Sequence, residues 1–310
     1  MASHVVHQLA WDEVFKRLSI PMQEKYHEAW QLFKMLAQGH DLFYPYLYYQ
    51  KNHSELEKAE LISQLNIIQA EGIQELVINY TDFLYNAEET LEKMLFLFGY
   101  LCHHFLDAHL HPIINYLCGE ASGSKHFLFE NQLDAYFLKQ EGIKPKNFKM
   151  YKMVASNKAL SNDTRVIINE SFKATYGFEN IDRIFADYNN VTKGFLKYAR
   201  YDPFGVKTLY AKIRLDRKMK DIKPSVLPFR FNGTELVGKL NEDRNFWANP
   251  ANLCHISNQS LEDLYQEGVM EIARMITDLE TAIMDRASAN EIKSIVENRS
   301  SDTGLILKLK

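Results

Sequence analysis

Apolar residues recur along most of the chain at spacings of three and four, which is the period of an amphipathic helix. Two opening helices are expected, one containing Val14 and Leu18 and one over residues 26–36, separated at Pro21. Further helices are predicted near residues 54–71, 73–85, 86–110, 125–139, 161–175, 179–199, 259–287 and 288–298. The pattern predicts an all-α fold, a multi-helix, bundle-like single domain.

Three stretches interrupt this pattern. Residues 42–49 are aromatic and contain a proline, which indicates a loop or a short turn of helix. Residues 140–160 are lysine-rich and predict a connector, and residues 201–253 hold four prolines and are expected to be mostly irregular. A division near residue 145 would separate a helical core, residues 1–145, from a helical extension, residues 146–310, packed on the same domain.

The ends of two helices can be predicted from single residues. Asn86 precedes the longest proline-free helix and can cap its first turn, and Pro112 is expected to interrupt or kink that helix after about residue 110. Ser260 stands before the acidic start of the helix over residues 259–287 and is a suitable N-cap.

Composition agrees with a helical protein. The 310 residues include 13 glycines and 8 prolines, well below the combined share of roughly 12% in soluble proteins, which excludes turn-dense all-β folds. The net charge of −4 excludes a strongly basic nucleic-acid binder. Three cysteines argue against a disulfide framework and suit a reducing compartment.

The start of the chain bears on localisation. Residues 1–12 have neither a basic start nor a long apolar run, so no signal peptide is expected. Residues 94–106 form the longest stretch without charged side chains near the apolar peak, and they are too short to span a bilayer. We therefore expect a soluble, cytoplasmic protein.

Histidine is the unusual residue, because five of the 11 fall between positions 103 and 126. His103, Asp107 and His111 are four apart, so they lie on one face of a helix. His104 lies on the flank of this face, near His111. His109 points the opposite way and is interpreted as a surface residue paired with an acid, or as a group that supports the site from outside.

The next predicted helix repeats the spacing with His126, Glu130 and Asp134. Packed together, two such helices could direct imidazoles and carboxylates at metal ions, and both groups bind zinc at about 2.0–2.2 Å. Apolar residues flank both segments, and burying so many titratable groups would be unfavourable without a metal or partners. The sequence therefore predicts a metal site between core helices.

Two other metal sites fit the spacing less well. A di-iron carboxylate bundle uses Glu-x-x-His, whereas here each histidine precedes its acid by four residues. The His-Glu-x-x-His helix of metalloproteases is absent from the sequence.

The stretches Gly99 to Pro112 (GYLCHHFLDAHLHP) and Gly39 to Phe43 (GHDLF) resemble the zinc-dependent phospholipase C family and its single-strand nuclease relatives, in particular the shorter bacterial members without a signal peptide. The resemblance is good over about residues 1–140 and weak beyond, in residues 240–250 and the helix after Ser260. It implies an all-α fold and a cluster of three zinc ions that hydrolyses phosphoester bonds.

The resemblance also implies roles for individual residues. His103 and Asp107 match the family's histidine and bridging aspartate, and His126 with Glu130 matches a later ligand pair. Asp41 matches a loop aspartate that serves as metal ligand and general base.

Three further positions concern the rest of the ligand set. His111 matches the next histidine at the spacing of the signal-less members, and His7 matches the N-terminal histidine ligand, with His4 as the alternative. His53 is the candidate for a histidine expected after the loop aspartate, and it reads equally well as an exposed helix start. Secreted members also use the amine of a processed N-terminal tryptophan. This chain begins with residues 1–3 as Met-Ala-Ser, so two or three zinc ions are expected.

The implied activity is a zinc-dependent, phospholipase C-like phosphodiester hydrolase, in which a metal-activated water attacks a phosphoester and Asp41 orients or deprotonates that water. A nuclease or nucleotidase on the same scaffold is an alternative. An HD-type phosphohydrolase built on His40 and Asp41 would leave the cluster at residues 103–130 unused. A metal-binding scaffold protein without catalysis is the remaining alternative.

Two segments bear on the substrate. The aromatic residues within 43–49 could line a substrate pocket, although core packing is the simpler interpretation. Residues 207–230 hold eight basic and two acidic residues, which could contact an anionic membrane or form an ordinary solvated surface. The expected partner is a phosphoester substrate, such as a phospholipid, and no stable nucleic-acid partner is expected.

Overall fold

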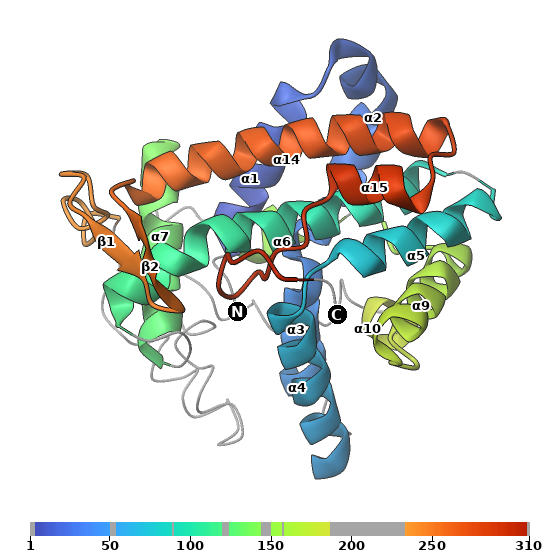
Figure 1. Cartoon of the computed structure of the whole chain (residues 1–310), viewed down its shortest axis with the longest axis horizontal. Coiled ribbons are helices and arrows are strands. Elements are labelled where there is room, and N and C mark those ends of the chain that lie inside the picture. The colour runs from blue at the N-terminus through green and yellow to red at the C-terminus, as the bar shows by residue number, and fades with distance from the viewer. Residues whose placement is uncertain are drawn as a thin grey trace.

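Helices form nearly all the regular structure in the described part of the chain (Figure 1). The computed structural model describes residues 4–49, 54–88, 90–119, 124–143, 150–156, 158–186 and 233–308. The only strands among these residues are β1 (Trp247–Asn249) and β2 (Asn252–Ser257), which pair as an antiparallel hairpin. The predicted all-α, single-domain architecture is confirmed, and the small hairpin is an addition that the sequence pattern did not predict.

The helices have the following bounds: α1 (His4–Arg17), α2 (Ile20–Leu32), the 3-10 helix η1 (Lys34–Leu42), α3 (Phe43–Tyr49), α4 (Glu55–Ala70), α5 (Gln74–Tyr85), α6 (Leu91–Cys118), α7 (Ser124–Gln140), α8 (Met150–Val154), α9 (Asn162–Tyr176), α10 (Asp182–Ala186), α14 (Leu261–Met284) and α15 (Ala289–Ile295). Most correspond to predicted helices. The aromatic stretch at 42–49 is helical as α3, and the connector at 140–160 contains the short helix α8. Of the helix predicted over 179–199, the described part shows α10, and residues 187–199 lie outside the described residues.

α6 is the central helix, because every residue from Glu92 to Asn115 is buried. α14 runs alongside it, and η1, α1 and α7 also contact it (Figure 1). α14 comes from the carboxy-terminal part of the chain, so both parts share one core, whereas a division at residue 145 stays a prediction. Since α6 is enclosed, its titratable side chains face other parts of the protein rather than water.

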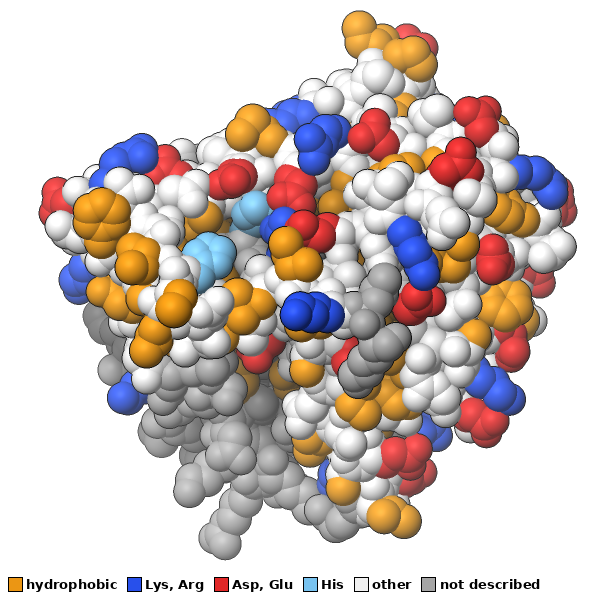
Figure 2. All heavy atoms as spheres, in the orientation of Figure 1, with side chains coloured by type: hydrophobic (Ala, Val, Ile, Leu, Met, Phe, Trp, Pro, Cys, Tyr) orange, Lys and Arg blue, Asp and Glu red, His pale blue; other side chains and the backbone are white. Residues whose placement is uncertain are grey.

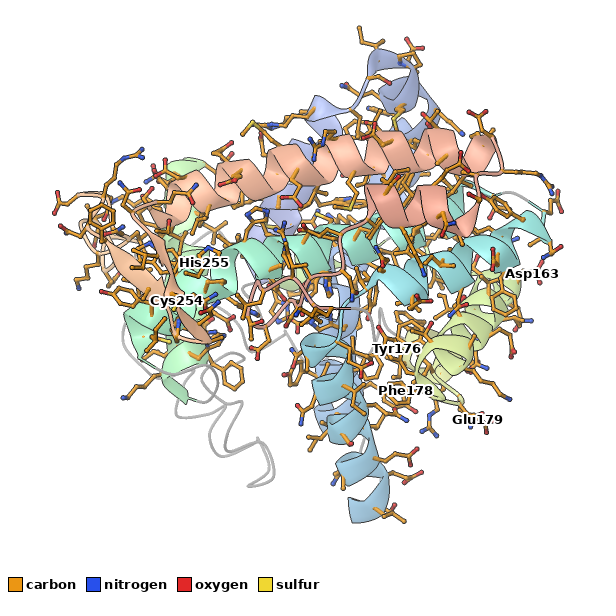
Figure 3. All side chains as sticks on the ribbon, in the orientation of Figure 1. Asp163, Tyr176, Phe178, Glu179, Cys254 and His255 are labelled. Atoms are coloured by element: carbon orange, nitrogen blue, oxygen red, sulfur yellow. The ribbon has the colours of Figure 1, made fainter. Side chains whose placement is uncertain are left out.

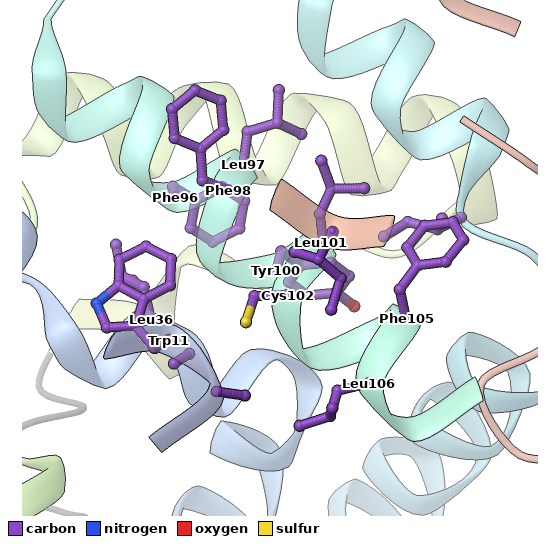
Figure 4. Close-up of a cluster of buried hydrophobic side chains, with 14 of the residues drawn as sticks. Trp11, Leu36, Phe96, Leu97, Phe98, Tyr100, Leu101, Cys102, Phe105 and Leu106 are labelled. Atoms are coloured by element: carbon purple, nitrogen blue, oxygen red, sulfur yellow. The ribbon is translucent and has the colours of Figure 1, made fainter. Parts of the chain in front are cut away.

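Close packing fixes α6 against η1. Figure 4 shows Trp11 and Leu36 beside the apolar side chains of α6. A Cβ at Gly99 would lie 2.7 Å from the backbone carbon of Leu36, so only glycine allows this approach. Trp11 in turn stacks on Trp30 at a ring-centroid distance of 3.6 Å. The polar face of α6 is thereby held next to η1.

The predicted start of α6 is wrong. Thr90 is its N-cap, whereas Asn86 ends α5 and its amide donates to the carbonyl oxygen of Asp82 at 2.9 Å. The predicted cap at Ser260 is confirmed. Its hydroxyl accepts the backbone N–H of Asp263, and the Asp263 carboxylate accepts the backbone N–H of Ser260, which is a capping box.

The predicted end of α6 is also wrong. The helix continues through Pro112 to Cys118 and ends at Gly119, whose φ of 73° suits glycine. A proline inside a helix removes one hydrogen bond and costs about 3 kcal/mol. Ile113 and Ile114, which follow it, are buried in the core, and their burial offsets this loss.

The second opening helix ends early. α2 stops at Leu32, and the predicted helical stretch to residue 36 continues instead into η1. Within η1, Gly39 has φ 47° and ψ −130°, which breaks the helical path. Among the described residues, no helix combines the length and the apolar character needed to cross a membrane.

Candidate metal centre

The amino-terminal helix is anchored beside α7. The Asp134 carboxylate accepts the backbone N–H groups of Val5 at 2.9 Å and Val6 at 3.3 Å. An acid at a helix N-terminus satisfies orphan donors and favours the helix dipole. Asp134, predicted as a lower-ranked ligand from its spacing, is therefore engaged with α1, and this contact holds His7 of α1 close to α6.

The turn in η1 brings a second segment to the same place. A Cβ at Gly39 would lie 2.6 Å from the His103 side chain, in addition to the positive φ of that residue. Only glycine permits this contact. His40 and Asp41, which follow directly, are therefore held against the polar face of α6, and both are almost fully buried.

Asp107 lies at the centre of the buried imidazoles. One carboxylate oxygen lies 3.1 Å from His7 Nε2 and 3.6 Å from His111 Nε2. The other lies 3.2 Å from His103 Nε2 and 3.8 Å from His40 Nε2. Burial alone would raise the pKa of Asp107, but the charges of His111, His103 and His7 outweigh burial and hold this pKa well below its ordinary value.

A second set of groups continues from α6 to α7. Glu130 Oε1 lies 3.0 Å from His126 Nε2 and 3.8 Å from His111 Nε2. Burial opposes charge on both partners of the closer pair. The mutual attraction wins nonetheless, raising the pKa of His126 to about 10 and lowering that of Glu130 to about 2. His111 thus faces both Asp107 and Glu130.

The described residues contain three groups of side chains that could each hold a metal ion. Within each group, the potential ligand atoms all lie within 4.8 Å of one another. The groups are His7–His103–Asp107, His40–Asp41–His103 and His111–His126–Glu130. All eight side chains are buried. His103 belongs to two groups, and Asp107 lies close to His111 of the third, so the three form one continuous cluster.

Unsatisfied atoms test whether this cluster fits a metal. In the described part of the chain, His103 Nε2, His111 Nε2 and Asp107 Oδ2 are buried without a hydrogen-bond partner. Both ring nitrogens of His40 are likewise buried without a partner among the described residues. Burying such atoms unpaired is unfavourable by about 1–3 kcal/mol each, and a bound cation would satisfy them. The donor set of imidazole and carboxylate suits zinc.

The outer nitrogens support the same interpretation. His103 Nδ1 donates to the carbonyl oxygen of Ala37 at 3.2 Å, and His111 Nδ1 donates to that of Ser301 at 2.8 Å. A carbonyl can only accept, so Nδ1 carries a proton, and in the neutral ring Nε2 has the lone pair that a metal ion would need. Metal-binding histidines are typically oriented in this way.

The remaining histidine predictions fall elsewhere. His104 directs Nε2 at the carbonyl oxygen of Arg299 at 2.7 Å and belongs to none of the three groups. His4 is buried, and its Nδ1 lies 2.6 Å from Gln38 Oε1. It belongs to none of the three groups, whereas His7 belongs to one. His53 lies outside the described residues.

The surface interpretation of His109 is wrong, since its side chain is only 7% exposed. Its Nε2 donates to Glu271 at 2.8 Å, on the face of α6 opposite the cluster. The acid comes from α14, so no spacing within α6 could have predicted it. His255, in contrast, lies exposed on the hairpin beside Cys254 (Figure 3).

The structure brings His40, a lower-ranked candidate, into one of the three groups, and it adds backbone carbonyls that the sequence could not predict. The available signal was Gly39 directly before His40 and Asp41, because glycine is the usual residue where the backbone turns tightly or approaches another group closely. The carbonyls of Ala37 and Ser301 belong to the backbone and leave no trace in residue type.

Of the two segments considered for substrate contact, only part of the aromatic one lies within the described residues. Phe43 and Tyr46 belong to the main hydrophobic cluster, and Tyr44 packs against it, which favours core packing for these aromatic residues. The side chains of Tyr48 and Tyr49 lie outside the described residues, as does the whole basic segment 207–230.

With the geometry established, comparison with known proteins gives a family. The family model described as zinc dependent phospholipase C matches residues 6–178, which is more than half of the chain. Comparisons with curated proteins and with solved structures found no match. The chain belongs to the zinc-dependent phospholipase C family.

Proposed function

We propose that this member of the zinc-dependent phospholipase C family is a phosphodiester hydrolase that uses the buried cluster as its metal centre. The observation that carries the proposal is the continuous set of eight buried histidine, aspartate and glutamate side chains joined through His103 and Asp107. Such a set supplies the ligands of a multi-metal hydrolase.

The proposed ligand roles follow from position. Asp107 presents one oxygen to His7 and the other to His103, so it suits a ligand shared between two ions. His126 and Glu130 of α7, with His111 of α6, would hold a further ion. We propose two or three zinc ions for the three groups.

Bound zinc would supply Lewis acidity and a coordinated water whose pKa falls toward about 7. Asp41 lies at the edge of the cluster, with Oδ1 4.0 Å from His103 Nε2. A carboxylate there can accept a hydrogen bond from a nucleophilic water and then its proton. We therefore assign Asp41 the role of positioning base as well as ligand.

The proposed substrate is a phosphoester, of which a phospholipid is the first choice because the family is named for that activity. A nuclease or nucleotidase would use the same ligands and is distinguished by substrate alone. His40 and Asp41 join the same cluster as His103, so they need no separate HD-type site. A scaffold protein that binds zinc without catalysis is the outcome if no substrate is turned over.

Metal content and turnover test the proposal. The purified chain should contain two or three zinc ions by mass spectrometry. Chelation should lower its melting temperature, because ligand in thousandfold excess over Kd stabilises by about 4 kcal/mol. A chain without zinc, whose stability ignores chelators, would contradict the proposal. Phosphatidylcholine vesicles and single-stranded oligonucleotides then separate the two hydrolase activities.

The variant Asp41→Asn tests the assigned base. We expect zinc to be largely retained and hydrolysis to fall by about 100-fold or more. The exposed Asp243 offers a matched control, and Asp243→Asn should leave both unchanged. Full activity in Asp41→Asn would refute the role of Asp41.

A further inference from the structure

The carboxy-terminal strap, residues 298–307, crosses α6 beside the candidate metal centre (Figure 1). It folds back on itself, with Ser300 N donating to Leu305 O at 3.0 Å and Leu307 N to Asn298 O at 2.7 Å. Ser300 and Ser301 are almost fully buried. The strap lies far beyond residue 178, where the family match ends.

Two backbone carbonyls of the strap accept hydrogen bonds from histidines of α6. The Ser301 oxygen accepts Nδ1 of His111 at 2.8 Å, and the Arg299 oxygen accepts Nε2 of His104 at 2.7 Å. The two histidines use different ring nitrogens for these contacts, Nε2 in His104 and Nδ1 in His111. His104 has its outer nitrogen engaged by the strap, whereas His111 keeps Nε2 directed at Asp107 and Glu130, at 3.6 and 3.8 Å.

The strap crosses α6 at its proline. Pro112 cannot donate a backbone hydrogen bond to the carbonyl of Ala108, one turn earlier. Gly304, with φ 67°, lies at this point, and a Cβ there would approach the Ala108 oxygen to 2.4 Å and Pro112 Cγ to 2.8 Å. The interior proline thus coincides with the crossing, and only glycine lets the strap lie this close.

Three elements hold the strap, two through side chains that donate to its backbone and one through a backbone carbonyl that accepts from the strap. Asn249 of β1 donates to Thr303 O at 2.8 Å, and Asn115 of α6 donates to Asp302 O at 3.4 Å. The Ser301 hydroxyl donates to the Gln69 carbonyl of α4 at 3.3 Å. Contacts on both sides of the Ser301 carbonyl fix the backbone that carries it, so this carbonyl can hold an imidazole in one orientation.

We propose that the strap is a positioning element of the metal centre, in which the Ser301 carbonyl fixes the His111 ring so that Nε2 binds a zinc ion shared with His126 and Glu130. This inference rests on the proposed function. It makes the carboxy-terminal end of the chain part of a site whose ligands all lie between residues 7 and 130.

A pair of glycine variants tests this role. In Gly304→Ala the new methyl group collides with the Ala108 oxygen and displaces the strap. In Gly177→Ala the glycine also has positive φ, 73°, but a Cβ would meet nothing within 4 Å. The two changes share the backbone strain and differ in the contact. Zinc affinity is measured by competition with a chromophoric chelator, and ligand geometry by the visible spectrum of cobalt-substituted protein.

We expect Gly304→Ala to bind its weakest zinc 10–100-fold less tightly and to show an altered cobalt spectrum. Gly177→Ala should match the parent chain in both. A milder variant, Asn249→Asp, removes the donor to Thr303 while keeping the acceptor for the Ala251 N–H. It should weaken the same zinc several-fold, and it decides the matter if Gly304→Ala does not fold.

The outcomes separate the two proposals. A parent chain without zinc contradicts the proposed function itself. A parent chain with zinc, and folded Gly304→Ala and Asn249→Asp that bind zinc like Gly177→Ala, overturns the strap inference alone. Equal loss in Gly304→Ala and Gly177→Ala would also overturn it, because backbone strain without strap displacement would then suffice.

Discussion

The two faces of α6 each bury histidine beside a carboxylate, yet they differ in whether the histidine nitrogens have hydrogen-bond partners. On one face, His103 and His111 approach Asp107 while their Nε2 atoms remain without hydrogen-bond partners in the described part of the chain. On the other, His109 is satisfied by Glu271 at 2.8 Å, and Arg299 lies 3.5 Å from the same carboxylate.

The surroundings of the two faces differ as well. The Glu271 face borders a pocket of about 480 Å³ shared with the hairpin and the strap. Histidine, acidic and basic side chains gather there at the surface (Figure 2). The Asp107 face is enclosed by α1, η1 and α7. The His109 contact with Glu271 satisfies both groups by itself, whereas the several buried imidazoles around Asp107 leave ring nitrogens unpaired within the described residues, which is unfavourable unless a cation or another partner binds there.

Replacing Asp107 by Asn should give the largest effect. The change removes the charge that four imidazoles approach and the ligand shared between groups. We expect the loss of at least one zinc ion per chain and a fall in hydrolysis of 1,000-fold or more, since metal and nucleophile are lost together. Zinc analysis and initial rates on phospholipid vesicles measure both. Retention of all zinc would break the distinction between the faces.

Replacing Asp134 by Ala should have an intermediate effect. The N-terminus of α1 loses its acceptor, which typically lowers the free energy of unfolding by about 1–2 kcal/mol. His7 is carried by the same helix, so zinc affinity should also fall. Ser260→Ala removes a cap of α14, a helix that supplies none of the cluster's ligand atoms, and is the matched control. Urea unfolding should show similar losses for both, with weaker zinc binding in Asp134→Ala alone.

Much of this architecture could be predicted because it is local. The spacing of His103, Asp107 and His111 fixes their common face once α6 is a helix, and Ser260 with Asp263 marks a helix start. Pro112 misled the prediction because tertiary burial outweighed its local penalty. The hairpin was not predicted because β1 and β2 span only three and six residues, which is too short to show a clear alternation of apolar and polar side chains.

The partners of the candidate ligands could not be predicted for a different reason. Ser301 lies 190 positions from His111, and Glu271 lies 162 from His109. No periodicity links residues so far apart. Asp134 had the right spacing for a ligand but caps α1, because the position of a neighbouring helix decides what a carboxylate contacts.

Replacing Glu271 by Gln should give the smallest effect and sharpens the comparison most. An amide oxygen can still accept from His109 Nε2, so we expect unfolding free energy to change by less than about 1 kcal/mol. The zinc content and hydrolysis should equal those of the parent chain, because this face supplies none of the cluster's ligand atoms. Together, Glu271→Gln and Asp107→Asn compare two acids that each contact a histidine of the same helix. Loss of zinc in Glu271→Gln would show that the two faces are coupled, with Arg299 of the strap as the connecting residue.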